Sequence, residues 1–123
     1  MRSLTGALVL MILALLPGAA FASGNKLLDH CNAAIDFMDN EPANPDFGAL
    51  GYCFGMMQGV TNTNAMYEVQ LGKDALFCAP EAGLNNGQAA RIVVKYLKDN
   101  PKELHRHGTI LAISAFMQAY PCE

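Results

Sequence analysis

The sequence predicts an all-α fold, a small four-helix-type bundle stapled by two disulfides. Apolar residues recur at the three- and four-residue spacing of a helix face, and no segment alternates as a strand does. Joints rich in proline, glycine and asparagine separate the helical segments. Four cysteines follow an export signal, and an even number of cysteines in a small exported domain is typical of disulfides.

Residues 1–22 have the three parts of a secretory signal peptide. Arg2 gives a positive start, Ala7–Leu16 is an uncharged apolar run, and Ala20-Phe21-Ala22 is an A-x-A cleavage site. The run is shorter than the roughly 20 residues that a helix needs to span a bilayer. We therefore expect cleavage before Ser23, one domain over residues 23–123, a periplasmic location and no membrane insertion after cleavage.

The first helix is expected over Asn25–Asn40. Its apolar residues follow helical spacing, and Pro42 and Pro45 forbid continuation. These apolar residues are Leu27, Leu28, Cys31, Ile35 and Met38.

The second helix is expected to begin at Asp46, a suitable N-cap residue, and to run to about Asn64. Gly51, Gly55 and Gly59 recur every four residues and form a stripe on one face. Each glycine costs a helix about 1 kcal/mol relative to alanine. We therefore expect a neighbouring backbone to approach this face closely.

The next segment, Val60–Gly72, leaves two alternatives open: it extends the helix, or it forms a loop with a short helix around Met66–Leu71. As a loop, Thr61–Asp74 is long for a joint between bundle helices, and long loops often carry function. Glu81–Gln88 is a second candidate loop. The side chains predicted to contact a partner are Asn62, Asn64, Tyr67, Glu68, Lys73 and Asp74.

The third helix is expected over Gln88–Asp99, with its apolar residues facing inward. Asn100, Pro101 and Glu103 have the pattern of a cap, a first helical residue and a capping box, so the fourth helix is expected to begin there. Its apolar stripe, which ends before Pro121-Cys122, consists of Leu104, Leu111, Ala115 and Ala119.

This topology favours one disulfide pairing out of three. Cys31 and Cys53 lie at similar distances on either side of the proline turn, so an antiparallel hairpin brings them together. Cys78 precedes the third helix and Cys122 follows the fourth, so a second hairpin joins those two. We predict the pairs Cys31–Cys53 and Cys78–Cys122.

The composition excludes several functional classes. The formal charge of −3 becomes −4 once Arg2 leaves with the signal, and no run of basic residues points to a nucleic-acid partner. His105 and His107 are two residues apart and point in different directions on a helix, and no Cys-x-x-Cys occurs, so we expect no metal. Paired cysteines leave no thiolate nucleophile. We predict no cofactor, no catalytic residue and no enzymatic activity.

The order of several short motifs resembles the Rap/Tai family of periplasmic immunity proteins, which protect bacteria from peptidoglycan amidases delivered by type VI secretion. Met56 departs from the family pattern, which usually has an aromatic residue there. The motifs are Leu27-Leu28-x-x-Cys31, Cys53-Phe54-Gly55-Met56-Met57-Gln58-Gly59, Phe77-Cys78-Ala79-Pro80, Gln88 with Tyr96-Leu97, Asn100-Pro101 with Leu104-His105, and Pro121-Cys122.

The resemblance implies an all-helical, disulfide-bonded protein that is often a homodimer. It also implies stoichiometric inhibition of a cognate amidase effector, by occlusion of the effector's active site and without turnover. The alternative is a small periplasmic stress or chaperone-like protein with no toxin partner, which would expose apolar surface in acid. A helical bundle that binds a lipid or another small ligand is a third hypothesis, and it requires an internal cavity.

Overall fold

The computed structural model describes residues 23–123, so the predicted signal peptide lies outside the described residues. The elements are α2 (Gly24–Asn40), α3 (Phe47–Leu71), η1 (Gly72–Asp74), α4 (Asn86–Asp99), η2 (Pro101–Glu103) and α5 (Gly108–Ala119). Over this range the protein has four α-helices and no strand, which confirms the all-α prediction. Within residues 23–123, no helix combines the length and the apolar character that crossing a membrane requires.

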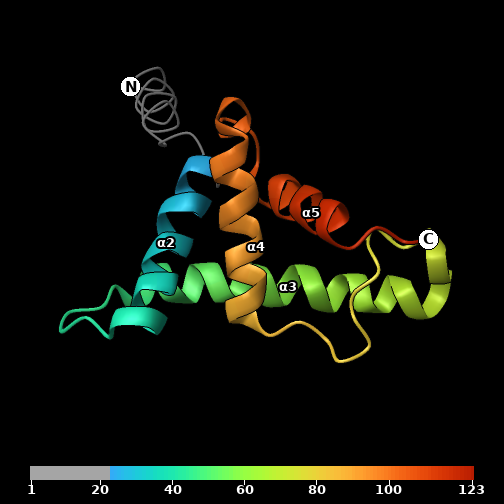
Figure 1. The fold of residues 1–123 in the computed structure, drawn as a ribbon, viewed down its shortest axis with the longest axis horizontal. Helices are drawn as coiled ribbons and strands as arrows, with labels where there is room; N and C mark the ends of the chain where they lie inside the picture. The colour runs from blue at the N-terminus through green and yellow to red at the C-terminus, as the bar shows by residue number, and fades with distance from the viewer. Residues whose placement is uncertain (1–22) are drawn as a thin grey trace, which may run out of the picture.

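The four helices pack across one another. Figure 1 shows α2 and α4 side by side, both running across the long helix α3. The last helix, α5, contacts the other three, and the chain ends near the far end of α3. The second half of α3 therefore extends beyond α2 and α4.

One apolar core joins all four helices. Leu27 of α2, Met57 of α3, Leu97 of α4 and Leu111 of α5 are fully buried in it. Burial of each such side chain stabilises the fold by about 1.5–3 kcal/mol. Met66 lies outside this core and is 60% exposed.

Both predicted disulfides are present. Cys31–Cys53 joins α2 to α3 with its Cα atoms 5.1 Å apart, and both cysteines are fully buried. Cys78–Cys122 joins the segment after η1 to the end of the chain, with its Cα atoms 4.9 Å apart. All four cysteines are therefore bonded.

Polar side chains cap the first three helices. Ser23, Asp46 and Asn85 each accept a hydrogen bond from the backbone N–H three residues ahead, which would otherwise lack a helical partner. The cap at Asp46 confirms the predicted start of α3, whereas α2 and α4 begin one and two residues earlier than expected.

The second helix is longer than its predicted end at Asn64. α3 continues to Leu71 and stops at Gly72, which has a φ of 59°. Of the two alternatives for Val60–Gly72, helix extension is the one observed, and the expected loop over Thr61–Asp74 is wrong for all but its last residues. The reason is that Asn64 and Glu68 find polar partners on the core side of the helix, as described below.

The fourth helix begins at Gly108, so the predicted start at Pro101 is wrong. The carbonyl of Leu104 accepts hydrogen bonds from the N–H and the side-chain amide of Asn25, and Arg106 O accepts from Gly24 N. Residues 104–107 therefore pair with the start of α2, and the short helix η2 does not continue into α5. As a consequence Leu104 lies outside α5, while Leu111 and Ala115 are buried as expected and Ala119 is exposed.

Candidate functional site

Charge is divided unevenly between the pair α2 and α4 and the pair α3 and α5. The 25 residues of α3 contain only one charged side chain, Glu68, and the 12 residues of α5 contain none. The 17 residues of α2 and the 14 of α4 carry eight: Lys26, Asp29, Asp36, Asp39, Arg91, Lys95, Lys98 and Asp99. An exposed surface without charge is typical of a protein–protein contact, which directs attention to α3 and α5.

The end of α3 is fixed by a side-chain clamp. Asn64, which is 1% exposed, donates to Phe77 O at 2.7 Å and accepts from Phe77 N at 3.3 Å. Glu68 accepts from Ala79 N at 2.9 Å and from the Asn64 amide at 2.7 Å. Two side chains on one face of α3 thus hold the extended segment 77–79 against it.

Further contacts lock the same region. Phe77 is fully buried, with its ring 5.0 Å from that of Phe116 on α5. Cys78 N donates to Tyr120 O at 2.9 Å, beside the Cys78–Cys122 disulfide. We call residues 64–79, with these contacts, the stapled tip.

The stapled tip displays apolar side chains to solvent. Val69 is 83% exposed, and the other exposed apolar residues of the tip are Met66, Tyr67, Leu71 and Leu76. Except for Tyr67, the sequence-based prediction missed them. The signal that would have found them is the near absence of charge along α3, because exposed apolar side chains gathered on an uncharged surface mark an interaction site.

The structure separates the six residues predicted to contact a partner. Asn62, Tyr67, Lys73 and Asp74 are exposed, and Tyr67 lies at the tip with Lys73 and Asp74 of η1. Asn64 and Glu68 are turned inward, which corrects the expectation for them: their polar atoms hold the protein's own backbone. Asn62 and Tyr67 are five residues apart and so project about 140° apart around the helix.

The glycines of α3 do not contact a neighbouring backbone within the protein, so that expectation is wrong. A Cβ atom built at Gly51, Gly55 or Gly59 would find nothing within 4 Å, and all three residues are exposed. They share one side of α3 with three further exposed residues at the same spacing of three and four. We call this side the glycine face: Gly51, Gly55, Gly59, Asn62, Met66 and Val69.

A groove of about 330 Å³ runs between α3 and α5, along one edge of the glycine face. Gly55, Gly59 and Thr63 line its α3 side, Thr109 and Ile113 line its α5 side, and Leu76 also contributes. No charged residue lines it. The groove can therefore accept apolar side chains but supplies nothing to fix a charged ligand.

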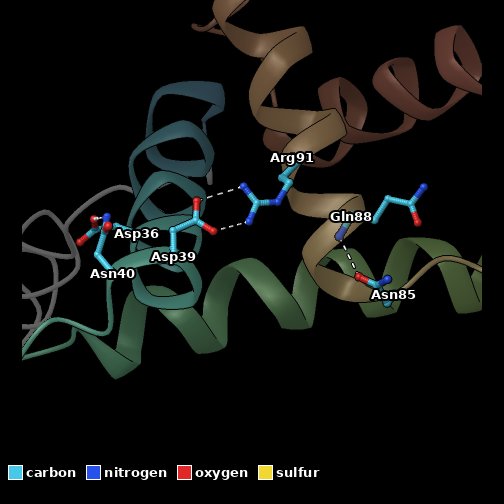
Figure 2. Close-up of polar contacts among 6 residues, drawn as sticks. All are labelled: Asp36, Asp39, Asn40, Asn85, Gln88 and Arg91. Atoms are coloured by element: carbon cyan, nitrogen blue, oxygen red, sulfur yellow. Dashed lines mark hydrogen bonds and ion pairs between the residues drawn. The ribbon is translucent and has the colours of Figure 1, made fainter.

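The pair α2 and α4 has polar contacts of its own (Figure 2). The guanidinium of Arg91 binds both carboxylate oxygens of Asp39, at 2.5 and 3.2 Å, and Figure 2 shows the two side chains pointing toward one another. The hydrogen bond from Arg91 holds the pKa of Asp39 below its ordinary value of 3.8. In the same way Arg106, 2.9 Å away, lowers the pKa of Glu103.

A cluster of ring contacts lies near the start of α3. Tyr52 lies edge-on to His30, with ring centroids 4.8 Å apart, and the Lys26 ammonium is 5.3 Å from the Tyr52 ring centre. Burial raises the pKa of Tyr52. These contacts tie α2 to α3.

Catalytic groups do not converge in the described residues. All four thiols are consumed by disulfides, and within residues 23–123 no three His, Cys, Asp or Glu side chains gather as a metal-ligand set. His105 lies in the turn before α5 and His107 at its N-cap position, both exposed.

In the second candidate loop, Glu81–Gln88, Asn85 caps α4 and the Asn86 amide donates to Gln58, so these polar groups serve the fold.

Comparison with known proteins gives one finding. Residues 23–122 match the model of one protein family, described as Rap1a immunity proteins. No curated protein and no solved structure gave a match.

Proposed function

This chain belongs to the Rap1a immunity protein family, and from that premise we propose that it neutralises a secreted peptidoglycan amidase effector. The mechanism is occlusion: the protein binds over the amidase active site, in a one-to-one complex, and catalyses nothing itself. The site of action is the periplasm, which suits a protein with two disulfides.

The stapled tip is the observation that carries this proposal. An inhibitor that occludes a cleft needs a protruding element with apolar side chains on a backbone that does not lose entropy on binding. Tyr67 and Leu71 lie one turn apart, 42% and 51% exposed, and are followed by Lys73 and Asp74. The Asn64–Glu68 clamp and the Cys78–Cys122 disulfide hold them in place before any partner arrives.

Electrostatics support the choice of partner. The exported chain has a formal charge of −4, and an acidic inhibitor is steered toward a basic enzyme at a rate that falls with salt. Tyrosine at the centre of such a contact is among the residues that most often dominate binding energy.

The test begins with the tagged, oxidised protein as bait in periplasmic and secreted fractions of its host, grown with type VI secretion active. The expected prey is one small cysteine–histidine amidase, recovered in one-to-one amount and inhibited at equimolar inhibitor. Tyr67→Ala should weaken the complex by about 2 kcal/mol, roughly thirtyfold in Kd. Ala82→Ser, an exposed change in the loop before α4, is the matched control.

Two results would count against the proposal. One is recovery of no hydrolase from these fractions. The other is an amidase that is bound but remains fully active at saturation, because a complex that leaves the active site open contradicts occlusion.

A further inference from the structure

An aromatic pair lies at the surface where α2 gives way to α3. Phe47, the first residue of α3, is 71% exposed. Its ring centroid is 6.3 Å from that of Phe37 near the end of α2, which is half-buried, and the two rings meet at 63°. A phenylalanine ring left in water gives the fold little of the stability that its burial would give. The Phe47 ring is therefore available to a partner.

Acidic charge surrounds this pair along the chain. Residues 27–72 contain no lysine or arginine and six carboxylates, which exceeds the formal charge of −4 of the exported chain, so the remaining residues are net positive. Four of the six carboxylates lie within residues 36–46, and all four are exposed. They belong to Asp36, Asp39, Glu41 and Asp46.

The chain itself neutralises only one of these four carboxylates. Arg91 binds Asp39, whereas Asp36 points away from Arg91 in Figure 2 and accepts a hydrogen bond from the amide of Asn40. Glu41 has no side-chain partner within residues 23–123. Its φ of 46° is in the left-handed region, where glycine would be less strained. A free carboxylate thus stands beside the aromatic pair at a cost to the backbone.

We propose that this surface binds an arginine-bearing segment of a partner protein. Charge complementarity requires a cationic partner. The exposed ring favours arginine over lysine, because a planar guanidinium stacks on an aromatic face while it donates hydrogen bonds to carboxylates. We call the surface the aromatic turn, and it consists of Phe37, Phe47, Asp36, Glu41 and Asp46.

Both kinds of contact occur elsewhere within the chain. The guanidinium of Arg91 binds both carboxylate oxygens of Asp39, and the ammonium of Lys26 lies 5.3 Å from the centre of the Tyr52 ring. The aromatic turn offers a ring and carboxylates together, and residues 27–72 supply no lysine or arginine to occupy them. A cation from a partner completes the arrangement.

The aromatic turn is separate from the stapled tip. Figure 1 shows the turn between α2 and α3 at one end of α3 and η1 at the other end. The 25 residues of α3 from Phe47 to Leu71 span about 36 Å, which is several times the roughly 8 Å over which salt screens charge at physiological ionic strength. The inference therefore does not depend on the proposed inhibition of an amidase.

The first test uses a peptide of alternating arginine and leucine with blocked ends. It is titrated into the oxidised, isotope-labelled protein, and NMR spectra report which residues respond. Saturable shifts are expected at residues 36–48. Phe47→Ala should raise the peptide Kd about threefold to fivefold, because the contact between the guanidinium and the ring is lost. Met117→Ala, an exposed apolar side chain on α5, is the matched control and should leave the Kd unchanged.

The second test separates binding from stability. Glu41→Asn removes the charge, and asparagine tolerates the left-handed conformation, so the variant should be no less stable than the wild type. The peptide Kd should nevertheless rise about threefold. Glu81→Asn, in the exposed loop before α4, removes the same charge and should not change the Kd. A peptide with lysine in place of arginine should bind about threefold more weakly than the arginine peptide.

Three results would overturn the proposal. One is the absence of saturable shifts, or shifts spread evenly over acidic residues elsewhere, such as Asp29 and Asp99. Another is a Kd that neither Phe47→Ala nor Glu41→Asn changes. The third is equal binding of the arginine and lysine peptides, because the ring would then play no part in choosing the cation.

Discussion

The pair α2 and α4 and the pair α3 and α5 differ in how much charge their surfaces carry. α2 and α4 are amphipathic, carry eight charged side chains and satisfy part of that charge between themselves through Asp39 and Arg91. α3 and α5 carry a single charge, which is turned inward, and expose Val69, Met66, Ile110 and Met117. The surface of the first pair suits contact with water, and the uncharged surface of the second pair is typical of a protein contact. In a chain that shows no catalytic constellation in its described part, the uncharged pair is where function is to be sought.

The largest expected effects come from the two disulfides, of which Cys31–Cys53 joins α2 to α3 and Cys78–Cys122 closes the stapled tip. Loop-closure entropy assigns about 3 kcal/mol to Cys31–Cys53 and about 4 kcal/mol to Cys78–Cys122, from sequence separations of 22 and 44. Replacing Cys31 and Cys53 by alanine should lower the stability of the whole protein, because both sulfurs are buried in the core. Replacing Cys78 and Cys122 should open the stapled tip first. Hydrogen exchange followed by mass spectrometry distinguishes the two: faster exchange confined to residues 64–79 is expected only for the second variant.

If both cysteine double variants lose protection equally in all four helices, the tip is not a separate region. The stability of the stapled tip would then be inseparable from the stability of the charged pair, α2 and α4.

Asn64→Ala should cost about 2–3 kcal/mol. The substitution leaves the N–H and the carbonyl of Phe77 without their partner in a buried setting, and each unsatisfied group costs about 1–3 kcal/mol. Urea denaturation of dilute protein measures the loss. Asn62→Ala, half a turn away and exposed, is the matched control and should change stability by less than about 0.5 kcal/mol. Equal effects of the two substitutions would contradict the clamp.

The glycines should respond in opposite directions. Gly59→Ala is expected to stabilise the monomer by about 1 kcal/mol, because alanine is the better helix former and nothing occupies the space. Gly24→Ala should destabilise it by about 1–3 kcal/mol, because its Cβ would press on the side chain of Leu111 and the backbone of Leu104. Thermal unfolding of both variants at low concentration tests the pair. Destabilisation by Gly59→Ala would show that the glycine face is packed within the monomer after all.

The smallest effect is the pH dependence of the ion pair on the charged side. Because Arg91 lowers the pKa of Asp39 below 3.8, the pair contributes its full stability above pH 3.8 and loses it as pH falls through the lower pKa of the folded state. Asp39→Asn should therefore lower stability slightly at neutral pH and make no difference in strong acid. Denaturation of both proteins between neutral pH and strong acid measures the difference in their free energies of unfolding. A difference that grows on acidification would contradict the prediction.

How far the sequence predicts this structure depends on which interactions decide each element. The core, three helices and both disulfide pairs follow from local periodicity and from the antiparallel hairpins that short joints impose. The start of α5 does not follow from local periodicity. The pattern Asn100-Pro101-x-Glu103 is typical of the start of a helix, but the backbone carbonyls of Leu104 and Arg106 accept hydrogen bonds from the start of α2 instead.

The candidate site was harder to predict for the same reason. Asn64 and Glu68 look like loop residues available to a partner, and only the distant segment 77–79 gives them an inward role. The glycines suggest close packing, and only the structure shows that nothing within the chain packs against Gly51, Gly55 or Gly59.

The central claim is that the stapled tip occludes an amidase. The most direct measurement is titration of the captured amidase with wild-type protein, with Tyr67→Ala and with Lys98→Ala, an exposed α4 variant on the charged side. The account predicts complete inhibition at one equivalent for the wild type and Lys98→Ala, and a roughly thirtyfold weaker Kd for Tyr67→Ala. Inhibition that is unaffected by Tyr67→Ala but lost in Lys98→Ala would place the contact on the charged helices and contradict the account.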